Sequence, residues 1–285
     1  MSSERKKMNL PGLWKKVENC EPITWLTCYD YPTAYLQDQA GIDMILVGDS
    51  LGMTMLGYES TLPVTMEDMI RHTQAVRRGA PHGFLIGDMP YMSYQPSVET
   101  AIRTAGRFMA EASCDGVKLE GGAEMADRIR GIVNAGIPCM GHLGLTPQSA
   151  SALGGFRVQG KSSLQAKKIV DDARALEEAG AFAILLEMVP DRLCELITER
   201  ARSSFIMSLG SGPHAHGQLL IYHDCFGLYP RFKPRMAKVF GNAGEVILNG
   251  LKQYVDEVSS KTFPQPENWF TMKDEEFDEL KKMLD

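Results

Sequence analysis

Eight short apolar runs recur along the chain, and most are separated by segments with the periodicity of a helix. Several of these segments, such as 163–180, end in Ala-Gly directly before the next run. Apolar strands that alternate with helices are typical of a parallel sheet with helical crossovers. Eight strands favour a closed (β/α)8 barrel, of the α/β class, over an open doubly wound sheet. The predicted strands are 23–28, 44–48, 84–87, 116–119, 137–141, 181–186, 204–209 and 218–222.

The length of 285 residues fits one such barrel. No G-x-G-x-x-G pattern follows the first apolar run, which removes the main support for a dinucleotide-binding domain. We therefore predict a single barrel domain over 1–264 with a short N-terminal extension. The residues 265–285 are polar and acidic, and we expect them to form a helical tail.

Composition excludes several classes of function. The net charge is -6 and no long Lys/Arg cluster is present, so we expect no nucleic-acid partner. No apolar run approaches the ~20 residues that span a membrane, and the N-terminus lacks the apolar segment of a secretory signal. None of the six cysteines forms a C-x-x-C pair, which indicates free, buried thiols in a reducing compartment. We expect a cytoplasmic protein.

Ionisable residues follow five of the apolar runs. They are Asp49, Asp88, Glu120, His142 and Glu187. In a barrel the carboxyl ends of the strands converge on one face, where active sites lie. Any one of the carboxylates could equally cap the helix that follows its strand, but five such residues together favour an active site.

Three converging carboxylates repel each other and need a counter-charge. Asp49, Asp88 and Glu120 offer only oxygen ligands, which suit Mg²⁺. A 2-oxo acid would bind such an ion through its keto and carboxylate oxygens. The ion would then polarise the ketone and stabilise the enolate formed when a neighbouring C–H is deprotonated. Glu187 ends a strongly apolar run that would raise its pKa, so we predict that it is the general base. Lys118 shares a strand side with Glu120 and either pairs with the substrate carboxylate or neutralises a metal ligand, and these interpretations are compatible.

Two further patterns are weaker. The residues 155–162, GFRVQGKS, match the P-loop pattern, but no strand precedes them, so we interpret them as a glycine-bearing active-site loop. His214 and His216 have no Cys or acidic residue close in sequence. We interpret them as loop histidines and not as ligands of a transition metal.

Long strings of specific sequence point to one family. They include TCYDYPTA (27–34), VGDSLGM (47–53), VKLEGG (117–122), GHLGLTPQS (141–149) and HGQLLIYHDCFGLYPRFKPRM (216–236). In these strings, and over about 23–264 as a whole, the chain resembles ketopantoate hydroxymethyltransferase.

The resemblance implies transfer of a hydroxymethyl group from 5,10-methylenetetrahydrofolate to 2-oxoisovalerate, a step towards pantothenate. It implies a Mg²⁺-dependent barrel of the phosphoenolpyruvate/pyruvate type, assembled as a homo-oligomer, commonly a decamer. It also implies a role for each matching residue. Asp49 and Asp88 would bind Mg²⁺ directly, and Glu120 would bind it through water. The residues that would contact the substrate are Ser50, Lys118 and His142. Glu187 would be the general base.

The chain departs from this family at 208–218. The family shows G-I-G-A-G-P followed by C-D-G-Q, where this chain has SLGSGP and then HAHGQ. The stretch follows the seventh apolar run, so we expect all of it to border the mouth of the active site. The changes then either alter which 2-oxo acid or one-carbon donor is accepted, or are neutral drift in a surface loop. Three alternatives therefore stay open. One is a paralogue in specialised metabolism. Another is a lyase of the related phosphoenolpyruvate mutase and isocitrate lyase group, which the string VGDSLGM argues against. The third is a non-catalytic barrel subunit, which the intact acidic residues and base argue against.

Overall fold

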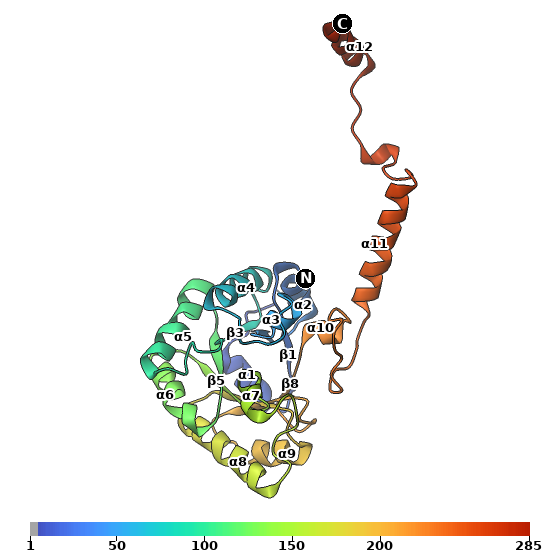
Figure 1. Cartoon of the computed structure of the whole chain (residues 1–285). Helices are drawn as coiled ribbons and strands as arrows, with labels where there is room; N and C mark the ends of the chain where they lie inside the picture. The colour runs from blue at the N-terminus through green and yellow to red at the C-terminus, as the bar shows by residue number, and fades with distance from the viewer. Residues whose placement is uncertain (1–4) are drawn as a thin grey trace. The chain divides into compact units, whose positions relative to one another are not determined.

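Eight parallel strands form a closed barrel in sequential order, as predicted (Figure 1). The computed structural model describes residues 5–285. The first and last strands pair with each other and close the barrel. The strands are β1 (Ile23–Thr27), β2 (Met44–Val47), β3 (Phe84–Asp88), β4 (Gly116–Glu120), β5 (Cys139–Gly144), β6 (Ala183–Glu187), β7 (Phe205–Leu209) and β8 (Gly217–Leu220).

The fifth strand lies further along the chain than the predicted range 137–141. Pro138 precedes the strand, and proline has no N–H to give to a ladder. The pairing continues instead through His142 and Gly144, which lie opposite Leu185 and Glu187. As a result His142 lies within β5 and not after it.

Helices follow the first six strands and surround the barrel (Figure 1). Ser162 and Gln165 form a reciprocal capping box at the start of the longest of these helices. Gly180 follows the same helix with a φ of +96°, which allows the chain to turn into β6. The residues 210–216 connect β7 directly to β8. The outer helices are α2 (Tyr31–Ala40), α4 (Met66–Gly79), α5 (Val98–Ala112), α6 (Ala126–Asn134), α8 (Ser163–Glu178) and α9 (Asp191–Arg200).

Short helical turns lie in the loops beyond the strands. They matter here because several carry residues of the cavity described below. They are α3 (Leu51–Thr54), η1 (Ala123–Met125), η2 (Pro147–Ser149), α7 (Ala150–Leu153) and α10 (Tyr222–Cys225).

Alternate residues of each strand pack on opposite sides of the barrel wall. Met44 and Leu46 of β2 join the cluster inside the barrel. Ile45 and Val47 of the same strand join the cluster between the strands and the outer helices. The four are at most 3% exposed, so β2 is buried on both faces, and its near-continuous apolar run follows from that.

Helix α1 (Leu10–Glu18) packs on the interior cluster before the first strand begins. Leu13 is fully buried there, and the ring of Trp14 meets that of Phe205, at the start of β7, edge to face at 5.4 Å. Both Phe205 and Ile23 begin their strands. Helix α1, within the predicted N-terminal extension, therefore covers the amino-terminal end of the barrel, opposite the carboxyl ends of the strands.

All six cysteines are free thiols, as predicted. Five are buried, whereas Cys20, between α1 and β1, is exposed. Burial raises the pKa of the thiols of Cys28, Cys194 and Cys225 to about 11 or 12. Such thiols stay protonated near neutral pH and react slowly.

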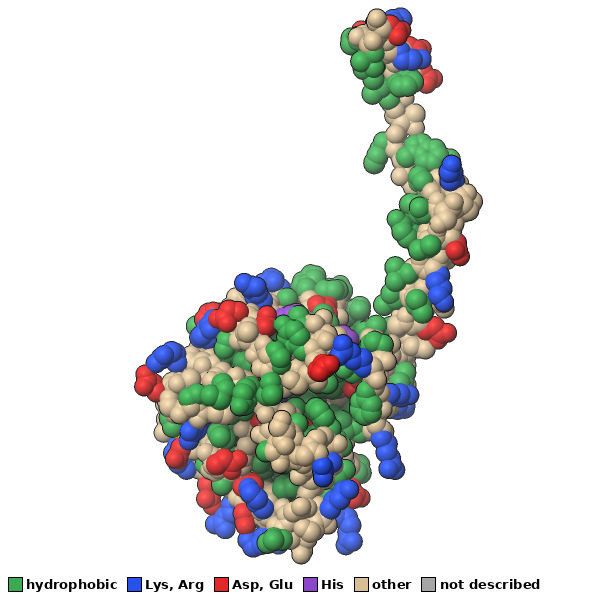
Figure 2. Space-filling view, in the orientation of Figure 1, with side chains coloured by type: hydrophobic (Ala, Val, Ile, Leu, Met, Phe, Trp, Pro, Cys, Tyr) green, Lys and Arg blue, Asp and Glu red, His purple; other side chains and the backbone are tan. Residues whose placement is uncertain are grey.

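The residues Phe226–Leu228 and Val239–Asp285 form a second compact unit. It contains α11 (Ala243–Ser259), η3 (Pro266–Asn268) and α12 (Asp274–Leu284), the last within the tail predicted to be helical. Apolar side chains are exposed along α11 and α12 (Figure 2). Such faces are typical of surfaces that another chain covers. The homo-oligomer and the domain boundary at residue 264 stay predictions. Within the described residues, no helix combines the length and apolar character needed to cross a membrane.

A test of the barrel packing uses two glycines on neighbouring elements. A Cβ at Gly87 of β3 would overlap the ring of Phe108 on α5, whereas a Cβ at Gly106 of α5 meets nothing within 4 Å. We expect Gly87→Ala to lower the free energy of unfolding by about 1–3 kcal/mol through overpacking. Gly106→Ala is the control and should raise stability by roughly 0.5–1 kcal/mol. Denaturant unfolding of the two variants measures this, and equal stability would contradict the packing.

Candidate active site

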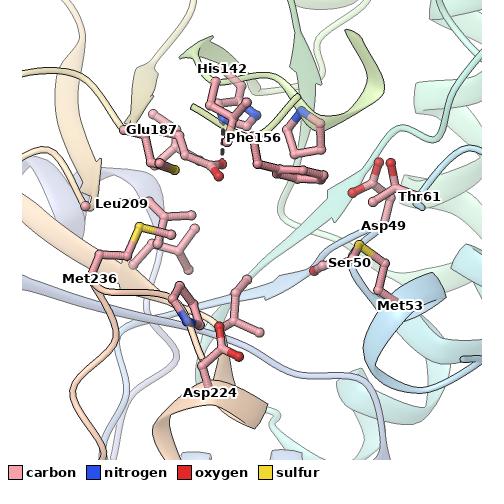
Figure 3. Close-up of a pocket in the computed structure, with 18 of the residues that line it drawn as sticks. Asp49, Ser50, Met53, Thr61, His142, Phe156, Glu187, Leu209, Asp224 and Met236 are labelled. Atoms are coloured by element: carbon pink, nitrogen blue, oxygen red, sulfur yellow. Dashed lines mark ion pairs between the residues drawn. The ribbon is translucent and has the colours of Figure 1, made fainter. Parts of the chain in front are cut away.

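One cavity of about 950 Å³ lies at the carboxyl ends of the strands (Figure 3). Asp49 lies two residues beyond the end of β2, while Asp88, Glu120 and Glu187 end β3, β4 and β6. In Figure 2 hydrophobic side chains surround the hollow at the centre of the barrel, and charged side chains lie around the outside. The cavity brings together every site residue predicted from the sequence: Asp49, Ser50, Asp88, Lys118, Glu120, His142 and Glu187. Their individual roles remain predictions.

Lys118 is the buried cation of this site. Its Nζ lies 2.8 Å from Asp88 Oδ1 and 3.3 Å from His142 Nδ1, and the side chain is 3% exposed. Burial disfavours the ammonium, but attraction by Asp88, Glu120 and Asp49 outweighs it, so the pKa of Lys118 lies above its ordinary value. The lysine is therefore charged and pairs with Asp88.

His142 links this lysine to the predicted base. An ammonium group offers only donors, so Nδ1 of His142 acts as an acceptor from Lys118 and the ring proton lies on Nε2. Nε2 is 3.1 Å from Glu187 Oε2. Burial and then the charge of Lys118 lower the pKa of His142, which keeps the imidazole neutral. The protonated Nε2 of this neutral tautomer lies beside the Glu187 carboxylate, although the two groups are not aligned as a hydrogen bond.

The carboxyl groups are poorly neutralised. Burial raises the pKa of Glu187. Burial also raises the pKa of Glu120, to about 8, and places that of Asp49 well above its usual value, with Asp88 and Glu120 adding repulsion. Within the described part of the cavity, these four carboxyl groups share one lysine at the barrel end. The site therefore has an excess of negative charge that a bound cation would relieve.

The oxygen donors fit Mg²⁺ but do not form a complete cage. Among residues 5–285, no three His, Cys, Asp or Glu side chains are arranged to hold a metal ion. Magnesium ordinarily uses one or two carboxylates and keeps water or substrate in its other positions. Asp49 and Asp88 supply two such carboxylates. Burial is the main cause of the raised pKa of Asp49 and Glu120, and repulsion from neighbouring carboxylates adds to it.

Gln148 and Tyr94 organise the acidic residues and were missed by the sequence reasoning. The amide Nε2 of Gln148 donates to Asp49 Oδ2 and to the carbonyl of Met89, both at 3.0 Å. Its Oε1 accepts the Tyr94 hydroxyl at 2.7 Å, and its backbone N–H donates to Glu120 Oε2 at 3.0 Å. Gln148 is uncharged and lies in a loop, so the pattern of ionisable residues after apolar runs did not indicate this role.

Ser50 is held from behind by a buried tyrosine. The hydroxyls of Ser50 and Tyr29 are 2.8 Å apart. Burial raises the pKa of Tyr29, which keeps its hydroxyl protonated. The ring of His223 packs against that of Tyr29 in a tilted arrangement, with centroids 5.3 Å apart. Tyr29 is thus fixed by packing and sets the position of the serine.

The departing stretch 208–218 only partly borders the cavity. Leu209 and Gly210 line it. Ser208 and Ser211 are fully buried and turn into the loop, where Ser208 donates to the carbonyl of Gly212 at 3.0 Å and Ser211 to that of Leu186 at 2.8 Å. The added hydroxyls are satisfied internally, so the two serines do not narrow the cavity.

The two histidines of this stretch lie away from the chemistry. His214 Nδ1 is 3.5 Å from Glu195 on α9. His216 Nδ1 accepts the backbone N–H of Ile206, in the middle of β7, at 2.9 Å. The chain must return from the end of β7 to the start of the parallel β8, so this part of the loop runs outside the barrel. The expectation that the whole stretch borders the mouth is wrong for His214 and His216.

The P-loop-like segment 155–162 follows the short helix α7 and no strand. Phe156 and Val158 within it line the cavity. This placement supports its interpretation as an active-site loop.

Comparison with known proteins adds the family to this geometry. The model of ketopantoate hydroxymethyltransferase matches residues 7–266. The chain belongs to this family. A 3-methyl-2-oxobutanoate hydroxymethyltransferase of Clostridium botulinum (strain 657 / Type Ba4) is 52% identical over 91% of this chain and 94% of its own. Another, from Moorella thermoacetica, is 51% identical over 94% of this chain and 99% of its own. The predicted family and transferase class are confirmed.

Solved structures support the barrel independently of the family. Phosphonopyruvate hydrolase, solved in complex with oxalate and Mg²⁺, has a TM-score of 0.58 at 14% identity and covers 97% of both chains. Oxaloacetate acetylhydrolase, solved with the product oxalate, has a TM-score of 0.61 at 14% identity and covers 93% of this chain and 92% of its own. At such low identity the likeness shows the fold alone, and it confirms the predicted barrel of this ketopantoate hydroxymethyltransferase family member.

A test of the polar network replaces its central amide. Gln148→Met removes the hydrogen bonds of the side-chain amide to Asp49, to the carbonyl of Met89 and to Tyr94. We therefore expect the free energy of unfolding to fall by about 2–4 kcal/mol. Gln95 shares one 3.0 Å bond with Gln148 and is only partly buried. Gln95→Met is therefore the matched control, with a loss below about 1 kcal/mol. Thermal unfolding of both variants decides this, and similar losses would remove Gln148 from the central position.

Proposed function

We propose that the protein transfers a one-carbon unit from 5,10-methylenetetrahydrofolate to 2-oxoisovalerate and forms ketopantoate. The donor, the oxo acid and water then give tetrahydrofolate and ketopantoate, with water supplying the hydroxyl group. The observation that carries the proposal is the contact of Glu187 with His142, beside an acidic cluster in one cavity. The names of the relatives support the substrate.

Glu187 removes the proton from C3 of the oxo acid in this proposal. Burial raises the pKa of Glu187, so its carboxylate is a stronger base than an exposed glutamate. Neutral His142, with Nε2 3.1 Å from Glu187 Oε2, would donate its N–H to the carboxylate and position it for proton transfer. Because His142 is buried and neutral, it positions the base without competing for the proton.

The acidic residues hold the oxo acid through a cation. Asp49 and Asp88 would bind Mg²⁺, with Glu120 acting through water. Magnesium there would supply charge to polarise the ketone and stabilise the negative charge that develops on its oxygen. Lys118 and Ser50 would contact the substrate carboxylate. These residues would orient C3 of the oxo acid towards Glu187 and keep its carboxylate and ketone in place.

The metal assignment is tested by binding and does not depend on turnover. Asp88→Asn removes one charge, and we expect the dissociation constant for Mg²⁺, measured by calorimetry without substrate, to rise at least about tenfold. Asp171→Asn, on the exposed face of α8, is the matched control and should bind normally. In the wild type, affinity should increase as pH rises towards the raised pKa of Glu120, about 8, because protons compete with the ion. Unaltered binding by Asp88→Asn would refute the site.

The base assignment is tested by proton exchange. Glu187→Gln keeps the shape of the side chain, so Mg²⁺ and 2-oxoisovalerate should still bind. Exchange of the C3 proton with deuterated water should fall about 10²- to 10⁴-fold, because an amide is not a usable base. Glu195→Gln, on the outside of α9, should exchange at the wild-type rate. Nuclear magnetic resonance follows the exchange, and a normal rate in Glu187→Gln would exclude this role.

A further inference from the structure

The cavity is larger than a 2-oxo acid requires. Cavities of about 300–1,000 Å³ hold drug-sized ligands, and this one has about 950 Å³. The acidic residues occupy one end, and the rest has room for a second and larger molecule. The side chains that line the rest of the cavity indicate which kind of molecule it would bind.

The wall away from the acidic residues is largely apolar. Met53, Phe156, Phe232 and Met236 line it. Thioethers and aromatic rings make broad contacts with flat ring systems. Phe156 and Phe232 are 57% and 65% exposed, so both rings are accessible to a ligand that enters from solvent. This wall suits a planar heterocycle better than a charged or highly hydrated group.

Two charged side chains, Asp224 of α10 and Arg235, interrupt this apolar wall. Figure 3 shows Asp224 across the cavity from His142 and Glu187. Within the described residues its carboxylate forms no hydrogen bond or ion pair. Partial burial raises its pKa to about 6. A partly buried carboxylate without a protein partner can accept hydrogen bonds from the N–H groups of a ligand.

The geometry of a carboxylate limits which groups of a ligand can pair with Asp224. A carboxylate has two oxygens that accept a pair of parallel N–H groups. A flat ring with two adjacent N–H donors on one edge satisfies both Asp224 and the wall around it. The 2-amino-4-oxopyrimidine ring of a reduced folate has such an edge, formed by its amino group and the neighbouring ring N–H.

We propose that Asp224 binds the aminopyrimidinone edge of the folate donor while Met53, Phe232 and Met236 pack against the ring. This assignment rests on the proposed function and adds the residue that recognises the donor. Anchoring the far edge at Asp224 directs the one-carbon end of the donor towards the oxo acid at Glu187. The ring also fills the apolar part of the cavity and excludes water from the reacting carbon.

The experiment compares binding of two ligands to the holoenzyme with Mg²⁺. Tetrahydrofolate is titrated against its analogue that lacks the 2-amino group, for the wild type, Asp224→Asn and the control Asp171→Asn. We expect the wild type and the control to prefer tetrahydrofolate at least tenfold, and Asp224→Asn to bind the two ligands within about threefold of each other. In turnover, KM for methylenetetrahydrofolate should rise at least tenfold in Asp224→Asn, by more than any change in KM for 2-oxoisovalerate.

Each outcome bears on one statement. If wild-type protein binds both ligands equally, or if Asp224→Asn keeps the full preference, the assignment of Asp224 is overturned. The wild-type comparison stands even if the variant does not fold. Failure of the proposed function has a separate signature: wild-type protein would neither exchange the C3 proton of 2-oxoisovalerate nor form ketopantoate with the donor.

Discussion

The ion pair between Lys118 and Asp88, buried at the end of the barrel, is the interaction on which the site depends. One ammonium group faces several carboxyl groups that burial makes reluctant to ionise. The barrel tolerates this arrangement because the strands fix the charges at its open end, where a ligand can reach them. A divalent cation bound at this end would relieve the residual negative charge.

Neutral groups give this charged cluster its shape. Gln148 joins Asp49 and Glu120, which arise from different strands, and Tyr94 completes the contact from the loop after β3. A hydrogen-bonded amide can hold two carboxylates without adding charge. Uncharged residues therefore set the distances between the charged ones.

Much of this arrangement could be predicted from the sequence, because the carboxyl ends of all eight strands of a barrel meet at one face. Residues that end different strands are therefore close in space. Asp49 and Glu187 each stand at the end of an apolar run, and the fold places both in one cavity. Gln148 could not be found in this way, since its role depends on long-range contacts from a loop. The histidines at 214 and 216 were misplaced for a related reason: residues 210–216 return along the outside of the barrel, and a strand pattern does not show the path of a connection.

The cysteines have a practical consequence. Five thiols are buried, while Cys20 is exposed at the amino-terminal end of the barrel, away from the cavity. A maleimide dye or spin label would therefore attach preferentially at this native position, without prior removal of the other cysteines. The natural protein thus offers a handle for fluorescence and resonance spectroscopy that leaves the chemistry at the opposite end of the barrel untouched.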